Sequence, residues 1–479
     1  AESYWFDEIF TLYDVGGGDG PAAGVTAHRG AIRSSAYLFL ASGWVRAFGT
    51  SEVATRALSV LCGTVAIVVT YLLGKEWLGR RVGLIGAALL AVSEFQIHYA
   101  QDFRFYAPLL LFTLLSFWAY LKALSGAKIA QLAAYVIATL LALYTHTHAV
   151  FFVAAQGAFL LVRWRSLRAT RGPMMLALAL VVAGSAPMAW RAASVAVAAG
   201  SKSALGWISD PPVSLIARTL YWYVLPLRHE RSWSAMALAG LGAAVVLTVG
   251  GVLSIRSVGL RQWLARLHGV TRPDDAIPSW RDDRMLLVAL WALSPIAAPF
   301  VLSKIVGPMY VERYTMPASP AWYLLIGWTL VRVRGVLPEY LPLAALAVLI
   351  VPGLAHYYAV DVKEQWRDVA AHVEAHGEPG DVIVVAPNEQ STQERAFGWY
   401  YDGALPICAI DAELEDARVD DAYAACCAGH GRCWLIVRGP APLARRFREA
   451  ILDASARVHV VQQMDYLRIT LYLTTMPGP

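Results

Sequence analysis

Ten apolar stretches, each close to the length of a membrane-crossing helix, constrain this chain more than any other feature of its sequence. A helix that crosses the hydrocarbon core of a bilayer needs roughly 20 mostly apolar residues. Only 16% of the residues are charged and 57% are hydrophobic, whereas an ordinary soluble domain has about 25% charged residues. The sequence therefore predicts a polytopic α-helical membrane protein with about ten transmembrane helices, near residues 54–74, 82–99, 105–121, 129–145, 148–162, 173–189, 235–254, 285–302, 318–331 and 338–358.

Two further apolar stretches, residues 36–48 and 213–227, are interrupted by charge or proline. Such segments are typical of helices that lie in the membrane interface rather than cross the bilayer. The sequence starts without Met, directly before the acidic pair Asp7-Glu8. We expect a further N-terminal span to precede residue 1.

The loops between the predicted spans differ in their content of Lys and Arg. One set of alternate loops holds 17 of these residues and the opposite set holds 8. Since loops rich in Lys and Arg stay in the cytoplasm, the first set is predicted to be cytoplasmic. The second set shares one outer, periplasmic or extracellular face, which would hold Asp7-Glu8, Asp102, the His146/His148 pair, residues 190–234, residues 304–313 and everything after residue 360.

Carboxylates and cations thus gather at one predicted membrane surface. The carboxylates are Asp7, Glu8 and Asp102, and the cations include Arg104 and Arg313. This combination suits a reaction in which a hydroxyl group loses its proton while a phosphate leaves. Transfer of a sugar from a lipid phosphate is such a reaction.

Five motifs follow one another in an order that resembles a known family. They are Asp7-Glu8, Phe48 to Ser59, Tyr99 to Tyr106, Tyr144-Thr145-His146 and Arg313 to Pro317. Over roughly residues 1–360 the chain resembles the GT-C glycosyltransferases of the protein-mannosyltransferase and aminoarabinose-transferase type, glycosyltransferase family 39 and its relatives. The resemblance implies the GT-C fold, a polyprenyl-phosphate sugar donor and an active site open to the periplasm or lumen. Where many relatives have His-Pro-Pro, this chain has His28-Arg29-Gly30.

The same resemblance assigns roles to the candidate residues. The first-loop Asp of the family is its catalytic carboxylate, and that role falls on Asp7, the expected general base. Glu8 and Asp102 would position the acceptor or orient Asp7. The expected ligands of the donor phosphate are Arg104, Lys304, Arg313, Tyr314, His146 and Arg29. No metal ligand is assigned and no cofactor is required, although related oligosaccharyltransferases hold a divalent ion with carboxylates and these carboxylates are compatible with one.

Each of these residues also has a structural interpretation. Asp7 and Glu8 are suited to capping a helix, and Asp102 with Arg104 can form a local ion pair that contributes little if exposed. Lys304 and Arg313 can anchor helix ends by extending toward the interface. His146 and His148 form a pair, but the sequence offers no third ligand for a metal.

The last 119 residues differ in composition from the rest, with more charge and alternating helical and strand patterns. The pattern predicts helices at 362–376 and 443–454 and strands at 381–385, 433–437, 458–461 and 467–473. We therefore expect a small periplasmic α/β domain at 361–479 after a catalytic membrane domain at 1–360. It lacks a nucleotide-binding glycine fingerprint, so acceptor binding, a lid or a purely structural role remain as alternatives.

Four of the five cysteines lie in this tail, at 408, 426, 427 and 433, while Cys62 lies in a predicted span. An oxidising compartment permits disulfides, and four cysteines allow three connectivities. A direct bond between the adjacent Cys426 and Cys427 would be strained, so one disulfide or none remains a further alternative. A metal cluster with His430 is a further alternative.

Taken together, these features predict an inverting glycosyltransferase of the inner (plasma) membrane. It would move a sugar from a polyprenyl-phosphate donor to a lipid, glycan or protein acceptor at the periplasmic face. The net charge of +5 comes from loop arginines and gives no reason to expect nucleic acid. One alternative is a transporter or lipid flippase with an accessory domain, but transporters place charges near the bilayer midplane and often contain repeats, and no repeat is apparent here. A second alternative is a non-catalytic assembly factor of an envelope complex that keeps the fold.

Overall fold

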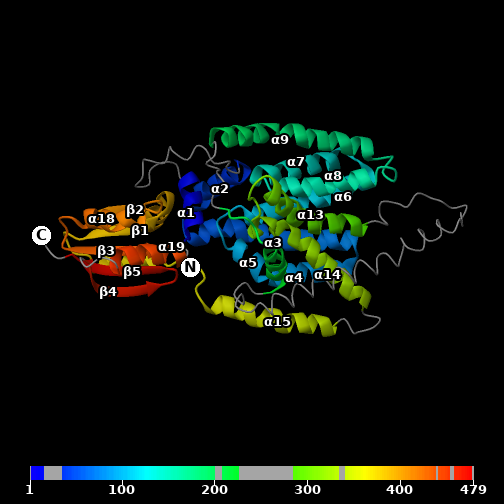
Figure 1. Ribbon diagram of the computed structural model, residues 1–479. Coiled ribbons are helices and arrows are strands. Elements are labelled where there is room, and N and C mark those ends of the chain that lie inside the picture. Colours follow the sequence, from blue (N-terminus) through cyan, green and yellow to red (C-terminus); the bar gives the residue numbers. More distant parts are fainter. Residues whose placement is uncertain are drawn as a thin grey trace, which may run out of the picture. The chain divides into compact units, whose positions relative to one another are not determined.

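The structure is a computed structural model that describes residues 2–15, 35–199, 208–225, 284–333, 340–438, 441–453 and 458–476 (Figure 1). The chain divides into two compact units. Unit 1 comprises residues 1–25, 48–54 and 357–479, and unit 2 comprises residues 26–47 and 55–356. The N-terminal segment thus belongs to the same unit as the C-terminal α/β domain.

Unit 2 is helical. Its elements are α2 (Ser35–Phe48), α3 (Glu52–Trp77), α4 (Arg80–Val92), α5 (Glu94–Ala100), α6 (Tyr106–Gly126), α7 (Ile129–Thr145), α8 (Ala149–Val162), α9 (Arg171–Ala199), α10 (Ser214–Val224), α13 (Arg284–Ile305), the 3-10 helix η4 (Glu312–Ala318), α14 (Ser319–Val333) and α15 (Tyr340–Ala359). The first residues of α3 and the last of α15 extend into unit 1.

Nine of the ten predicted apolar stretches coincide with helices, and the tenth, 235–254, falls outside the described residues. By length and composition, four described helices are able to cross a membrane, or five if one bent pair counts as a single span. Shorter helices such as α8, with 14 residues, are only about 21 Å long, which is less than the roughly 30 Å thickness of the hydrocarbon core. The two stretches expected to lie in the interface form α2 and α10.

The stretch near 82–99 differs from the expected single span because it forms α4 and α5, which meet at a bend of 61°. Ser93 separates them in an extended conformation, and its hydroxyl donates to the carbonyl of Tyr223 at 3.1 Å. An extended residue interrupts the ladder of helical hydrogen bonds. The bend redirects the chain toward residues 101–106, which carry one of the family motifs.

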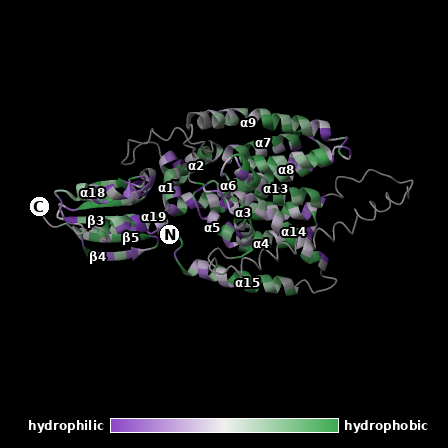
Figure 2. Ribbon diagram, in the orientation of Figure 1, coloured by the Kyte–Doolittle hydropathy of each residue, from purple (hydrophilic) through white to green (hydrophobic). Residues whose placement is uncertain are grey.

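The helices of unit 2 pack in pairs, α6 with α7, α4 with α14 and α8 with α13. α4 and α14 approach each other closely, since a Cβ on Gly86 would lie 2.8 Å from Leu324 Cδ2 and would force that side chain to shift. Figure 2 shows mostly apolar residues along these helices. On α9, large apolar side chains such as Leu176 and Trp190 are exposed, as expected of a helix that faces lipid.

Unit 1 contains α1 (Phe6–Val15) and a five-stranded sheet of order β2-β1-β3-β5-β4. Its other elements are α16 (Trp366–His376), β1 (Val382–Asn388), η5 (Glu389–Ser391), α17 (Thr392–Gly398), β2 (Ile407–Asp411), α18 (Asp416–Cys427), β3 (Arg432–Arg438), α19 (Ala441–Arg448), η6 (Glu449–Asp453), β4 (His459–Tyr466) and β5 (Ile469–Thr475). β1 pairs in parallel with β2 and β3, whereas β5 runs antiparallel to β3 and β4.

The α/β domain has helices on both faces of its sheet. Val384 and Leu435 pack in one core with Tyr423 of α18 and Phe447 of α19. On the other face, His372 of α16 contacts the ring of Trp434. Every residue of β1 is buried, which fits a strand covered on both sides. The helices and strands predicted for this tail are present, and β2, α17 and α18 are additional.

The four tail cysteines form two disulfides, Cys408–Cys426 and Cys427–Cys433, while Cys62 is a buried free thiol. The Cα atoms are 5.8 and 6.1 Å apart, within the usual range for disulfides. This selects one of the three connectivities that the sequence left open, and the adjacent Cys426 and Cys427 are not bonded to each other.

Candidate functional site

Three segments of unit 2 meet around the ring of His146. The ring of Phe105, just before α6, stacks on His146 with centroids 4.6 Å apart. The centre of the Tyr314 ring, in η4, lies 4.3 Å from that of His146 and 5.3 Å from that of His148. The sequence motifs at 99–106, 144–146 and 313–317 therefore converge, and we call residues Phe105, His146, His148 and Tyr314 the His146 cluster.

Two arginines border the His146 cluster. The Arg104 guanidinium lies 5.4 Å from the centre of the Phe105 ring, and the Arg313 guanidinium lies 5.6 Å from that of Tyr314. Both cations act electrostatically on His146. Asp102 is buried, and both it and Arg313 interact electrostatically with Tyr99. Two guanidinium groups thus border the aromatic cluster.

The two histidines lie in the turn between α7 and α8. Burial lowers the pKa of His146 well below its ordinary value, and His148, Arg104 and Arg313 lower it further. Burial also lowers the pKa of His148 to about 4. Both rings are therefore neutral near pH 7. A neutral imidazole offers one hydrogen-bond donor and one acceptor, so positive charge at this cluster comes from the arginines.

Hydrogen bonds to its backbone fix η4, which carries Arg313 and Tyr314. Tyr223 donates to the Thr315 carbonyl at 2.8 Å, and Trp291 Nε1 donates to the Pro317 carbonyl at 2.8 Å. Both donors are buried. The position of Arg313 and Tyr314 is thus set by helices α10 and α13 rather than by η4 alone.

Two charges near the cluster in sequence, Glu312 and Lys304, bind other partners. Glu312 forms an ion pair with Arg218, with Nε 3.1 Å from Oε1. Lys304 binds Asp210 with Nζ–Oδ distances of 2.7 and 2.8 Å. Lys304 therefore has an acidic partner of its own. Arg29 lies outside the described residues.

The predicted acidic pair lies in the first turn of α1 in unit 1. Asp7 is half-buried. Glu8 is fully buried, and its carboxylate accepts hydrogen bonds from Lys363 Nζ at 3.0 Å and from the Trp5 backbone N–H at 3.3 Å. Glu8 thus caps α1 and neutralises a buried cation, whereas Asp7 keeps partial access to solvent.

Sequence reasoning missed Lys363, Glu364 and Arg438. Glu364 is buried and binds Arg438 Nε at 3.0 Å and Trp366 Nε1 at 2.7 Å. Its carbonyl also accepts a hydrogen bond from Ser3. The available signal was the position of Lys363-Glu364 directly before the Gln365 to Asp368 motif, but nothing local to that motif indicates partners in the N-terminal segment.

A polar cavity of about 400 Å³ also lies in unit 1. Its lining residues are all polar: Glu2, Ser3, Asp361, Lys363, Gln365, Arg367 and Asp368. Its two cations already bind carboxylates, Lys363 with Glu8 and Arg367 with Glu52. The cavity is therefore poorly suited to a phosphate.

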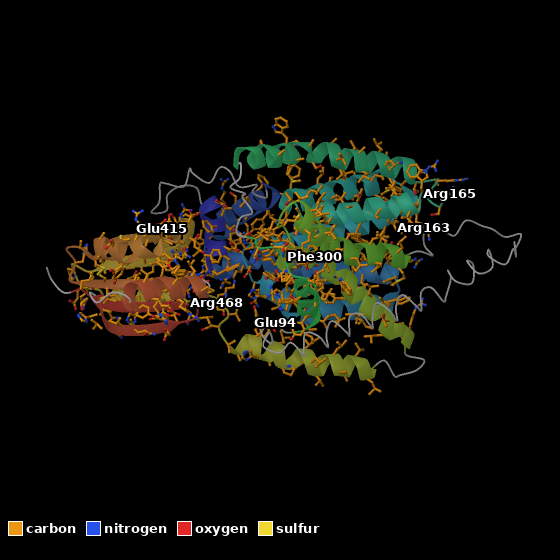
Figure 3. The ribbon with its side chains drawn as sticks, in the orientation of Figure 1. Glu94, Arg163, Arg165, Phe300, Glu415 and Arg468 are labelled. Atoms are coloured by element: carbon orange, nitrogen blue, oxygen red, sulfur yellow. A yellow bond between two sulfur atoms is a disulfide. The ribbon has the colours of Figure 1, made fainter. Side chains whose placement is uncertain are left out.

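The arginine-rich loop after α8 and the His146 cluster lie at opposite ends of that helix. α8 begins after His148 and ends before Arg163, and Figure 3 shows Arg163 and Arg165 at its far end. The helix spans about 21 Å between them.

Among the residues that the structure covers, no three His, Cys, Asp or Glu side chains are grouped closely enough to hold a metal ion. A structural zinc site takes four ligands and a catalytic one takes three with a water. The described residues therefore do not form a metal centre by themselves, and the cations that the structure describes beside the His146 cluster are Arg104 and Arg313.

Comparison with known proteins identifies the fold. Residues 35–190 match the family described as dolichyl-phosphate-mannose-protein mannosyltransferase. The solved structure of ArnT from Cupriavidus metallidurans in the apo state aligns with a TM-score of 0.54 and 13% identity, covering 98% of this chain and 94% of that one. The fold is that of the GT-C glycosyltransferases. The resemblance seen in the sequence is thereby confirmed.

A second GT-C protein is similar over most of the chain. The oligosaccharyltransferase from Archaeoglobus fulgidus, in complex with Zn and sulfate, aligns with a TM-score of 0.50 and 14% identity. The alignment covers 88% of this chain and 62% of that protein. No curated protein matches the sequence. The GT-C fold is therefore shared with proteins whose sequences have diverged far from this one.

Proposed function

We propose that this protein is an inverting glycosyltransferase that takes a sugar from a polyprenyl-phosphate donor at the periplasmic or extracellular membrane face. The observation that carries the proposal is the convergence of Arg104, Arg313, Tyr314 and His146 in one cluster of a GT-C fold. A guanidinium group is planar and can donate two parallel N–H hydrogen bonds to phosphate oxygens. The matched family is named for a donor of this class, dolichyl-phosphate-mannose.

In the proposed reaction the acceptor hydroxyl attacks the anomeric carbon of the sugar. Asp7 accepts the hydroxyl proton as general base while the bond between the anomeric carbon and the phosphate oxygen breaks. Arg104 and Arg313 offset the negative charge that develops on the leaving polyprenyl phosphate. Attack from the face opposite the leaving group inverts the anomeric configuration.

Neutral His146 and Tyr314 would supply hydrogen bonds to the phosphate, because both rings lie at the centre of the cluster. Asp102, which is buried, would position the acceptor or orient Asp7. Lys304 is left out of this assignment because it already binds Asp210. The acceptor, which the sequence leaves open as a lipid, a glycan or a protein, carries the attacking hydroxyl in each case.

The test uses purified full-length protein in liposomes with a panel of radiolabelled polyprenyl-phosphate sugars that includes the mannose donor. A membrane extract supplies lipid, glycan and protein acceptors, and transfer of label into acceptor is measured. We expect one donor to be used and Asp7→Asn to lower its turnover roughly 100-fold or more. Asp14→Asn, on the same helix, is the matched control and should retain activity.

Absence of transfer from every donor would contradict the enzyme assignment, and movement of intact donor across the bilayer would favour a flippase. Near-parental turnover by the Asp7→Asn protein would remove Asp7 as the base while leaving the donor class intact.

A further inference from the structure

Helix α1 is too short to be stable on its own. It has ten residues, and isolated helices below about 12–15 residues are marginal in water. Its stability must come from packing within unit 1. Ile9, Thr11 and Leu12 are each about 1% exposed, so one face of α1 is fully covered.

Arginines of the α/β domain cover the aromatic residues of α1. Arg438, at the end of β3, lies 4.5 Å from the centre of the Phe6 ring. Arg395 of α17 lies 5.8 Å from Phe10 and 5.9 Å from Tyr13. These three aromatics lie at positions i, i+4 and i+7, and Figure 1 shows α1 beside the α/β domain of this unit. The domain therefore holds α1 along its length.

The Glu8–Lys363 ion pair restricts the rotation of α1 about its own axis. The two side chains are 0% and 4% exposed and 355 residues apart in sequence. Apolar contacts tolerate small rotations of a helix, but a buried carboxylate must keep its cation, because an unpaired buried charge is strongly unfavourable. Consecutive helical residues are offset by about 100°. Fixing the direction of Glu8 therefore fixes the direction of Asp7.

We propose that the C-terminal α/β domain orients the catalytic helix, and that Lys363 is a positioning residue that acts on Asp7 through Glu8. This inference rests on the proposed function, in which Asp7 is the general base. It gives the domain a role in the transfer step and assigns Glu8 to orienting Asp7 rather than to contacting substrate. The loss expected on breaking the pair is thus a loss of turnover rather than of donor binding.

The experiment compares three variants of the full-length protein with the donor that the parent uses. Lys363→Met leaves Glu8 without its cation. Glu8→Gln combined with Lys363→Met replaces the pair by neutral side chains of similar size and keeps an acceptor for the Trp5 N–H. Arg448→Met removes an exposed cation from the same domain and serves as the control. Turnover and the KM for donor are measured separately, together with hydrogen exchange of the α1 amides.

We expect Lys363→Met to lower kcat about tenfold or more, with the donor KM within about twofold. The neutral double variant should recover α1 protection from exchange but keep a lowered kcat, because the helix packs without its directional constraint. The Arg448→Met protein should match the parent. A double variant with protected α1 and parental kcat would overturn the inference, as would parental kcat for Lys363→Met.

Asp7→Asn assayed in parallel separates the two proposals. If Asp7→Asn is inactive while Lys363→Met and the double variant are fully active, only the positioning role is wrong. If Asp7→Asn is active, the assignment of the base is wrong instead.

Discussion

Replacement of Glu364 by Gln tests how strongly the α/β domain holds the N-terminal segment. Glu364 is 1% exposed, and its carboxylate bonds Trp366 through one oxygen and the 11%-exposed Arg438 through the other. Removing one partner of a buried ion pair costs about 3–5 kcal/mol. Gln keeps one oxygen as an acceptor and retains the shape, so we expect about half of this loss, about 2 kcal/mol.

A loss of about 2 kcal/mol corresponds to a roughly 30-fold increase in the population of the opened state. Hydrogen exchange of the full-length protein measures it directly, and peptides from α1 and the end of β3 should exchange faster by that factor, because Arg438 stacks on Phe6. The matched control is Asp416→Asn, which removes the partner of Arg446 in a pair whose side chains are 70% and 32% exposed. Exposed pairs contribute at most about 1 kcal/mol. If exchange of α1 in Glu364→Gln is no faster than in Asp416→Asn, the Glu364 network does not hold the helix.

Three further outcomes are expected. A cysteine placed in the loop at 163–171 should resist an impermeant thiol reagent in intact cells, whereas one placed on the surface after residue 360 should be labelled, and the reverse pattern would refute the shared outer face. Arg313→Ala should raise the donor KM roughly tenfold and Arg313→Lys less, because lysine keeps the charge without the planar fork, while Lys304→Ala should leave donor binding near the parental value. Although burial raises the pKa of Asp381, hydrogen bonds from Arg432, the Glu378 backbone and Trp434 lower it below its ordinary value. A carboxylate whose pKa is lowered by folding stabilises the fold above its unfolded pKa of about 4, and this stabilisation is lost as the pH falls through the lower folded pKa. Asp381→Asn should therefore speed exchange in β1 at pH 7, and the difference from the parent should shrink as the pH falls below about 4.

The apolar helices could be predicted from the sequence because the length of an apolar stretch depends only on consecutive residues. The bend at Ser93 was not, because an extended residue between two apolar helices depends on its bond to Tyr223, 130 residues away. β2 was missed for a similar reason, since Ile407–Asp411 is a five-residue edge strand that is partly exposed and has no strong alternation. Its place in the sheet comes from pairing with β1.

The candidate site was predictable in part. The motifs that carry Arg104, His146 and Tyr314 indicated loops that share a face, and the structure brings these residues together. Sequence alone did not show that Lys304, unlike the two arginines, binds an acidic partner, because that partner, Asp210, lies 94 residues away. The different roles expected for Asp7 and Glu8 came from the family resemblance alone. The full burial of Glu8 beside Lys363 was not predictable from two adjacent carboxylates.

The distance along the chain between Glu8 and Lys363 has a consequence for biosynthesis. Unit 1 is assembled from the two extremes of the described sequence, with 355 residues between the paired side chains. Contacts of such long range form late, because the intervening chain must first be made and folded. A nascent chain that stops before Arg438 lacks the residues that cover Phe6 and bind Glu364. Helix α1 would then be ordered only after the last domain has emerged and folded. If Asp7 is the base as proposed, an incompletely made or proteolytically clipped protein would be inactive even with every membrane helix in place.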